Sequence, residues 1–190
     1  RGRPIVNLVP MAKEDRVAGV IPIREFDERS VVIATRGGQI KRTNLLRYKN
    51  IRAGGIIACG LKEGDAVLTV QLLEDQEGSI LMSTADGKAI HFPAEQAREM
   101  GRSARGVRGI GLVGDDKVVS MEIMREGANV LTITENGFGK RTPISEYRPQ
   151  GRGGVGLIDI KTRGRNGSVV GAVLVDEGDG PAIAARSLRP

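Results

Sequence analysis

The chain has 190 residues and a formal net charge of +6, from 29 Lys and Arg against 23 Asp and Glu. Three Phe, two Tyr and no Trp offer too few aromatic faces for a surface that stacks single-stranded nucleic acid. The single histidine and the single cysteine exclude a His/Cys metal site and an internal disulfide, and they leave little for Ser-His or Cys-His catalysis. No apolar run reaches the roughly 18 residues of a membrane span.

The chain opens with a strand-like segment and not with a signal peptide. Residues 2–8 (GRPIVNL) resemble the fourth strand of a repeat whose first three strands are absent, and residues 1–4 look like a cut inside a longer protein. A single cysteine suits the reducing conditions of the cytosol. We therefore expect a cytoplasmic domain with no membrane partner.

Three hairpin-like segments follow, at a period near fifty residues. Residues 34–43, 83–92 and 133–142 each lead from a β-branched strand through a Gly-Gly, Asp-Gly or Asn-Gly turn into a return strand. The turn glycines, spaced by 49 and 50 residues, are Gly38, Gly87 and Gly137. The sequence therefore predicts three β-hairpins built alike.

Two further landmarks repeat with nearly the same period. Valines that start another strand recur at spacings of 50, 51 and 51 residues, at Val17, Val67, Val118 and Val169. Glycines that start a fourth strand recur at spacings of 51 and 48 residues, at Gly55, Gly106 and Gly154. Four short strands per fifty residues are typical of a propeller blade. Short helical turns are expected only near residues 93–100 and 143–147.

The predicted fold is therefore all-β, a propeller-like arrangement of four-stranded blades of about fifty residues each. About four blades are present, and both end blades are incomplete. We divide the chain into blade fragments 1–9, 10–62, 63–113, 114–164 and 165–180, which together form one domain of residues 1–180. Residues 181–190 follow as a tail.

Basic and acidic residues occupy different zones of each repeat. Residues 29–62 carry eight basic residues and no acid, whereas acids gather in segments such as 25–28, 74–77 and 176–179. Equivalent positions of stacked repeats lie on one track, so the basic zones predict a continuous positive stripe suited to a polyanion. The candidate nucleic-acid-binding residues are Lys41, Arg42, Arg47, Lys49, Arg52, Lys88, His91, Arg102, Arg105, Arg108, Lys140, Arg141, Arg148 and Arg152.

Two of the rarer residues fit this register. His91 takes the place of Arg42 and Arg141, just beyond the return strand, which favours a role on the stripe. Cys59 aligns with Ile110 and Ile158, which indicates a position in the hydrophobic core.

Several motifs resemble the C-terminal domain of bacterial DNA gyrase A, over essentially the whole chain up to about Asp179. The similar segments are residues 2–8, the Thr-x-x-Gly-x-x-Lys-Arg-Thr hairpins, residues 106–110 (GVRGI) and residues 165–173 (RNGSVVGAV). Residues 150–156 (QGRGGVG) match five of the seven positions of the family's Q-R-R-G-G-K-G wrapping motif, with Gly151 and Val155 as the exceptions. In the family the true motif lies in the first blade, so this stretch is interpreted as the equivalent loop of a later blade.

The resemblance implies a β-pinwheel, a propeller-like ring in which neighbouring blades exchange strands. It also implies that duplex DNA is bound and wrapped around a basic rim, in support of ATP-dependent negative supercoiling by the parent type II topoisomerase. The implied partners are the N-terminal strand-passage part of gyrase A and the separate protein gyrase B, in a heterotetramer. The parent enzyme uses ATP and Mg, whereas this domain is expected to be non-catalytic, with no cofactor and no metal.

Two alternatives stay open at this point. The matching domain of topoisomerase IV resembles the gyrase domain but lacks the wrapping motif. From another class, a propeller-type scaffold with a basic face would bind an acidic protein. A steep salt dependence of binding to DNA would separate DNA binding from the scaffold function.

Overall fold

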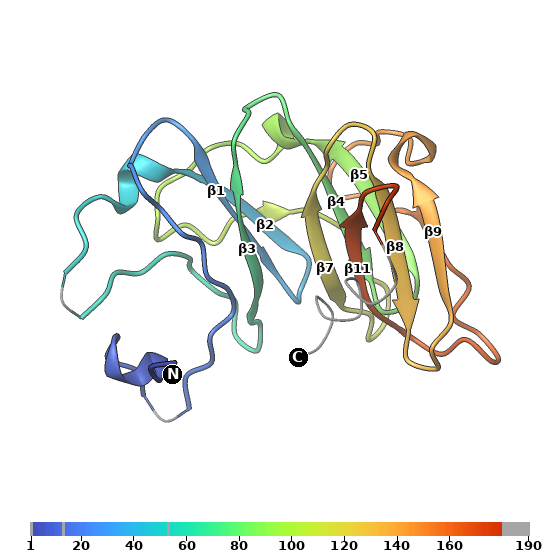
Figure 1. The fold of residues 1–190 in the computed structure, drawn as a ribbon, viewed down its shortest axis with the longest axis horizontal. Helices are drawn as coiled ribbons and strands as arrows, with labels where there is room; N and C mark the ends of the chain where they lie inside the picture. The colour runs from blue at the N-terminus through green and yellow to red at the C-terminus, as the bar shows by residue number, and fades with distance from the viewer. Residues whose placement is uncertain (1, 13, 53, 180–190) are drawn as a thin grey trace.

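The computed structural model describes residues 2–12, 14–52 and 54–179, and its strands form three sheets side by side along the long axis (Figure 1). In order across the first sheet, the strands are β3 (Val67–Leu73), β1 (Ser30–Thr35), β2 (Gln39–Asn44) and β6 (Val107–Arg108). Those of the second sheet are β10 (Leu157–Ile158), β5 (Lys88–Pro93), β4 (Ser79–Thr84) and β7 (Val118–Ile123). Those of the third sheet are β11 (Val169–Val175), β8 (Asn129–Thr134) and β9 (Gly139–Pro143).

The described residues contain no α-helix, which confirms the all-β prediction. The only helical elements among them are four short 3-10 helices: η1 (Ile5–Asn7), η2 (Leu45–Tyr48), η3 (Ala94–Gln96) and η4 (Ile144–Glu146). Two of these, η3 and η4, lie in the segments where the sequence predicts a helical turn. The predicted tail at residues 181–190 lies outside the described residues.

The three predicted hairpins are confirmed. They are the pairs β1–β2, β4–β5 and β8–β9, each antiparallel in one continuous register. Their turn glycines have φ angles of 80°, 79° and 80°, a left-handed conformation that costs a residue with a Cβ about 1–2 kcal/mol. The turn chemistry of the sequence is therefore a sufficient reason for the hairpins to form where they do.

Neighbouring repeats exchange strands. The long strands β3, β7 and β11 each pair with the first strand of the hairpin that precedes them in the chain. The two-residue strands β6 and β10 reach further back and pair with the return strands β2 and β5. Each sheet therefore combines a hairpin from one fifty-residue segment with strands of the next.

The register of the exchanged strands corrects one predicted landmark. Val107 pairs with Ile40, and Leu157 pairs with the equivalent Ala89, so the glycine equivalent to Gly106 is Gly156 and not Gly154. Both glycines have positive φ angles, 88° and 73°, and each lies against the carbonyl of the return strand. The true spacing is therefore 50 residues, and the counterpart of Cys59 becomes the buried Ile160 in place of the exposed Ile158.

Three strands expected near the N-terminus do not form. Residues 2–8 contain the 3-10 helix η1, and neither the segment that starts at Val17 nor residues 55–58 contain a strand. In the other repeats, the equivalent strands pair with a hairpin that precedes them in the chain. No described hairpin precedes residue 30, so these three segments have no sheet edge to which they could add.

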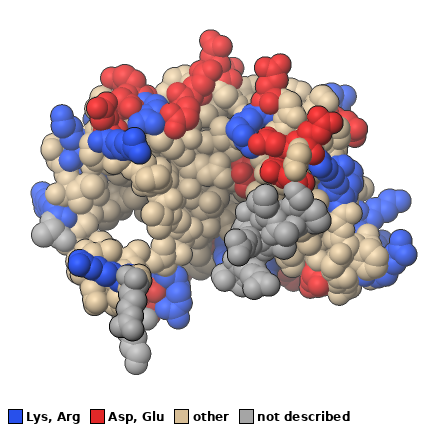
Figure 2. Space-filling model, in the orientation of Figure 1, with Lys and Arg blue, Asp and Glu red and all other residues tan. Residues whose placement is uncertain are grey.

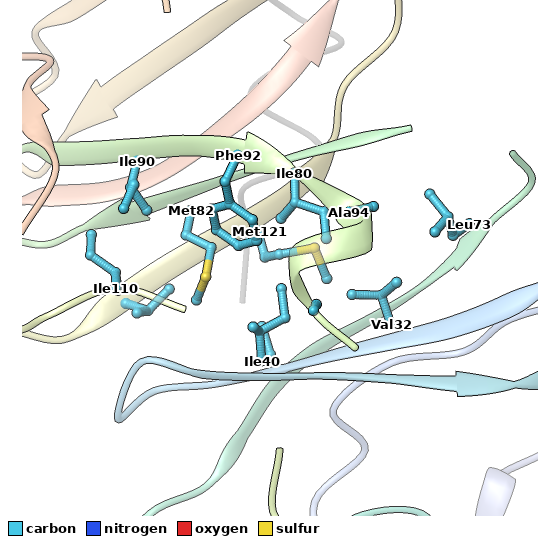
Figure 3. Close-up of a cluster of buried hydrophobic side chains, with 13 residues drawn as sticks. Val32, Ile40, Leu73, Ile80, Met82, Ile90, Phe92, Ala94, Ile110 and Met121 are labelled. Atoms are coloured by element: carbon cyan, nitrogen blue, oxygen red, sulfur yellow. The ribbon is translucent and has the colours of Figure 1, made fainter. Parts of the chain in front are cut away.

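The main core lies between the first and second sheets. Val32 and Ile40 of the first sheet point toward Ile80, Met82 and Phe92 of the second, and all five are fully buried (Figure 3). Alternate residues of a strand point to opposite faces, so the neighbouring Leu81 packs instead against Val130 and Ala172 of the third sheet. The second sheet thus contributes one face to each of two cores.

A side-chain amide joins β3 and β7, which are edge strands of the first and second sheets. The Gln71 Nε2 atom of β3 donates to the Met121 carbonyl of β7 at 2.9 Å, and its Oε1 atom accepts from the Ile123 amide at 3.1 Å. Gln71 Nε2 also lies 3.2 Å from the Glu122 carboxylate. Burial raises the pKa of Glu122 to about 7, and the hydrogen bond from Gln71 offsets part of this shift.

We expect the substitution Gly106→Ala to lower the free energy of unfolding by about 2–4 kcal/mol. A Cβ at this position would lie 2.5 Å from the Ile40 carbonyl oxygen, and the positive φ adds backbone strain. Urea unfolding of both proteins measures the difference. The matched control is Gly101→Ala, whose Cβ meets no atom within 4 Å and whose effect should stay within about 0.5 kcal/mol.

We expect Glu122 to make stability depend on pH between about 4.5 and 7. Its pKa is raised in the folded state, so its contribution to stability is complete below the unfolded value near 4.5 and is lost as the pH rises through about 7. The loss is about 3–4 kcal/mol, at about 1.36 kcal/mol per pKa unit. Unfolding of the wild type and of Glu122→Gln at several pH values tests this, because the difference between them should change over that window and stay constant outside it.

Candidate nucleic-acid interface

The predicted basic residues fall into two groups in the structure. Six have exposed side chains that form no hydrogen bond or ion pair with any described residue: Arg47, Lys49, Arg52, Arg105, Arg108 and Arg148. Most of the others donate to protein acceptors. The exposed group therefore provides the charges that are available to a ligand.

An open groove of about 890 Å³ brings three arginines together. One wall is η2 and the segment after it, with Arg47 and Arg52, and the other is the segment of residues 101–103, with Arg102. The exposed Ile57 lies in the first wall, and the Arg102 Nη1 atom donates to its carbonyl at 3.2 Å. None of the described lining residues is an Asp or Glu, so the groove presents uncompensated positive charge.

The local sequence explains why these segments stay in loops. Asn44 ends β2 and caps η2, because its side-chain oxygen accepts from the Leu46 amide at 2.9 Å. The chain then runs through Gly54 and Gly55 without a strand. Arg47, Lys49 and Arg52 consequently lie on exposed backbone and not in a sheet ladder. Arg105 and Arg148 occupy the corresponding loops that follow β5 and β9.

Lys41 was predicted to bind DNA, and the structure contradicts this. Its side chain is only 1% exposed, and its Nζ atom donates to the Ala58 carbonyl at 2.6 Å and to the Arg102 carbonyl. Desolvation lowers the pKa of this ammonium, and the charge of Arg102 lowers it further. Lys41 occupies the position in its hairpin that the fully buried Ile90 occupies in the next hairpin. This equivalence was the sequence signal for an inward-facing side chain.

His91 also faces inward, against the prediction. Its Nδ1 atom lies 2.5 Å from the Tyr147 carbonyl oxygen and must donate to it, because that oxygen can only accept. In the neutral ring, Nε2 then accepts from the Ser79 hydroxyl at 2.9 Å. Both ring nitrogens are satisfied within the protein, so His91 has no atom left for a phosphate.

Three predicted arginines are tied to protein acceptors. Arg42 donates to the Gln76 side chain at 3.3 Å, and Arg141 donates to the Asp176 carbonyl at 2.9 Å. Arg152 is held more firmly, because its Nε atom donates to the Gln96 carbonyl at 2.8 Å and its Nη1 atom donates to the Arg108 carbonyl. These arginines hold loops together, and Arg152 in particular joins the loop after β5 to the segment before β10.

Two predicted lysines have intermediate environments. Lys140 is exposed, but its Nζ atom donates to the Asp159 carbonyl at 2.8 Å and lies 3.5 Å from the Asp159 carboxylate. That carboxylate, 3% exposed, accepts from the hydroxyls of Thr132 and Tyr147 at 2.6 and 2.7 Å. Burial and the Asp159 carboxylate raise the pKa of Tyr147. Lys88 is half-buried in β5.

Acidic side chains gather along the upper edge of the face shown in Figure 2, with basic side chains among them and at the two sides. Two exposed or half-buried arginines take part in ion pairs, Arg29 with Asp27 and Glu74, and Arg125 with Asp176. The charges of these arginines are therefore partly neutralised. This contrasts with the groove of Arg47, Arg52 and Arg102.

Other kinds of site are missing from the described residues. In the ranges 2–12, 14–52 and 54–179, no three His, Cys, Asp or Glu side chains are placed to hold a metal ion. Within the same ranges, no helix has the length and apolar character that crossing a membrane requires.

We expect the two groups of arginines to differ in their effect on stability. Arg152→Ala removes two hydrogen bonds to carbonyls and should lower the free energy of unfolding by about 1–3 kcal/mol. Arg148→Ala, at an exposed position nearby, should change it by no more than about 0.5 kcal/mol. Chemical denaturation of both variants measures this, and equal losses would contradict the division into tied and available arginines.

Comparison with known proteins extends these observations. The chain is 47% identical to the DNA gyrase A protein of Salmonella typhimurium and 42% identical to that of Escherichia coli, in each case over 180 residues. These matches cover 94% of this chain and 20% of each relative, so the chain spans about a fifth of their length.

Two solved structures share the fold. The C-terminal domain of DNA topoisomerase IV superposes with a TM-score of 0.85 at 25% identity, over 93% of this chain and 55% of that chain. The DNA gyrase A C-terminal domain gives a TM-score of 0.82 at 24% identity, over 92% and 59%. The family model described as "DNA gyrase C-terminal domain, beta-propeller" matches residues 29–74, 78–123 and 128–176, one match for each of the three hairpin repeats. The chain therefore belongs to the DNA gyrase C-terminal domain family of beta-propellers.

Proposed function

We propose that this chain binds duplex DNA along its exposed basic loops and bends it, as the C-terminal domain of a DNA gyrase A protein. The observation that carries the proposal is the groove of Arg47, Arg52 and Arg102, which lacks any described acidic lining residue. Arg105 and Arg148, in the corresponding loops of the next two repeats, extend the positive charge. The names of the relatives support the same assignment.

The binding mode follows from the chemistry of these side chains. Guanidinium groups on exposed loops suit phosphate oxygens, which carry no base information, so binding should tolerate different sequences. Duplex DNA carries one charge per roughly 1.7 Å of its axis, and each neutralised phosphate releases counterions. Bending 20–30 base pairs costs on the order of 1–6 kcal/mol, which contacts from several repeats would offset.

The rest of the assignment concerns the longer parent protein. In this proposal the domain holds a wrapped segment for the strand-passage part of gyrase A, which works with gyrase B in the cytoplasm. ATP-dependent negative supercoiling would require those parts, and this domain itself would need neither ATP nor Mg.

The matching domain of topoisomerase IV is a second candidate, because the superposition with that structure is as good as with the gyrase domain. Supercoiling by the reconstituted parent enzyme supports gyrase, whereas relaxation alone supports topoisomerase IV.

We expect the double substitution Arg47→Ala with Arg52→Ala to weaken binding equally for unrelated duplexes. Each lost phosphate contact should flatten the slope of log K against log salt by about 0.9, so the pair should change it by about 2. At 0.1 M salt this corresponds to a roughly tenfold loss of affinity per contact. Fluorescence anisotropy over a range of salt concentrations measures both quantities.

The control removes two exposed acids, Glu77 and Glu126, by substitution with Ala. Glu74 is kept because it pairs with Arg29. This control should leave the salt slope unchanged and the affinity equal or slightly higher. An arginine pair that leaves affinity and slope untouched would place the DNA path elsewhere and would favour the protein-scaffold alternative.

A further inference from the structure

Lys41 connects the two segments that form the walls of the basic groove. Its Nζ atom donates to the carbonyl of Ala58, at the end of the first wall, and to the carbonyl of Arg102, in the second. The two acceptors are 44 residues apart in the sequence. A single buried ammonium thus replaces the hydrogen bonds that a regular sheet would otherwise supply to these loops.

Neighbouring contacts brace the first wall and join it to the second. The Tyr48 hydroxyl donates to the Ala58 carbonyl at 3.3 Å, and the Arg102 Nη1 atom donates to the Ile57 carbonyl at 3.2 Å. The Gly60 amide donates to the Ala104 carbonyl at 3.1 Å. Among the described side chains that donate to the Ala58 carbonyl, Lys41 is the only charged one. The strength of its hydrogen bonds to Ala58 and Arg102 therefore depends on whether its amine is protonated.

The charge of Lys41 has no carboxylate counterion among the residues that the structure describes. No described carboxylate forms an ion pair with it, and both of its acceptors are neutral carbonyls. Lys140, in the equivalent column of the third repeat, does have a carboxylate partner, Asp159, at 3.5 Å. A buried cation without a counterion is costly, and a polyanion held in the groove above would stabilise it.

We propose that Lys41 is a positioning residue of the basic groove, because its ammonium group holds both walls in place. A polyanion in the groove would favour the charged form of Lys41. This inference rests on the proposed binding of duplex DNA. Lys41 touches no phosphate in this role. It places Arg52 and Arg102 on fixed backbone, so its loss should remove the contributions of several arginines together.

The titratable groups that face Lys41 are consistent with such coupling. Cys59, Tyr48 and Arg102 surround it, and burial raises the pKa values of the Cys59 thiol and the Tyr48 hydroxyl. Both are therefore uncharged at neutral pH. Because burial lowers the pKa of Lys41, its ammonium loses its proton at a lower pH than an exposed lysine does. The walls should consequently loosen at a lower pH than the one at which an exposed lysine loses its proton, before the arginines change charge.

The first test compares Lys41→Met with Ile90→Met, which places the same side chain in the equivalent buried column of the second repeat, away from the groove. Lys41→Met should flatten the salt slope by about 2 to 3, more than one phosphate contact can account for. Ile90→Met should keep the wild-type slope whatever its effect on stability. A folded Lys41→Met protein with the wild-type slope would overturn the inference, as would equal changes in both variants.

The second test does not depend on the folding of that variant. It uses the protein with Cys59→Ala and Lys49→Arg, which removes the nearby thiol and leaves arginines as the exposed basic side chains next to the groove. Calorimetric titrations with a duplex at a series of pH values upward from neutrality, in buffers of different ionisation enthalpy, should show proton uptake on binding that begins at a lower pH than an exposed lysine would give. Binding without proton uptake would overturn the inference. Failure of the wild type to bind duplex with a steep salt dependence would instead contradict the proposed function, and the inference with it.

Discussion

The structure depends on hydrogen bonds between the return strand of one hairpin and a two-residue strand that arrives from the following repeat. β6 adds to β2 and β10 adds to β5 through only two residue pairs each. Such short ladders are possible because Gly106 and Gly156 pass against the carbonyls of the return strands, where a Cβ would not fit. The loops that carry Arg105 and Arg148 end at these two glycines, so the exchange determines where those charges lie.

Buried and half-buried polar side chains take over where the sheet hydrogen bonds stop. Lys41 of β2, His91 of β5 and Arg152 of the segment before β10 each donate to backbone carbonyls of another loop. Carbonyls in irregular segments need such partners when they are buried, because an unsatisfied acceptor costs about 1–3 kcal/mol. The same residue types that suit a phosphate therefore serve the architecture, and exposure separates the two roles.

Sequence reasoning predicted the hairpins well because their signals are local. Gly38, Gly87 and Gly137 permit positive φ angles, and β-branched residues precede them, so no distant contact is needed to specify the turns.

The predicted strands at residues 2–8 and 55–58 were wrong because such strands form only on a partner strand edge that is far away in the sequence. Lys41 and His91 were misplaced for a related reason, since a charge pattern records the residue type but not the direction of the side chain. The choice of Gly154 over Gly156 arose from two glycines within one turn-rich stretch, and only the pairing of Leu157 with Ala89 identifies the equivalent one.

The two-sided packing of β4 has a mechanical consequence. Ile80 and Met82 fill one core while Leu81 fills the next, so any rotation of the second sheet toward the first must open the contact with the third. Closely packed interiors resist such movement. The row of sheets should therefore behave as a stiff arc and not as a chain of hinges, and a flexible polymer laid along its outer loops would take its radius of curvature from the protein.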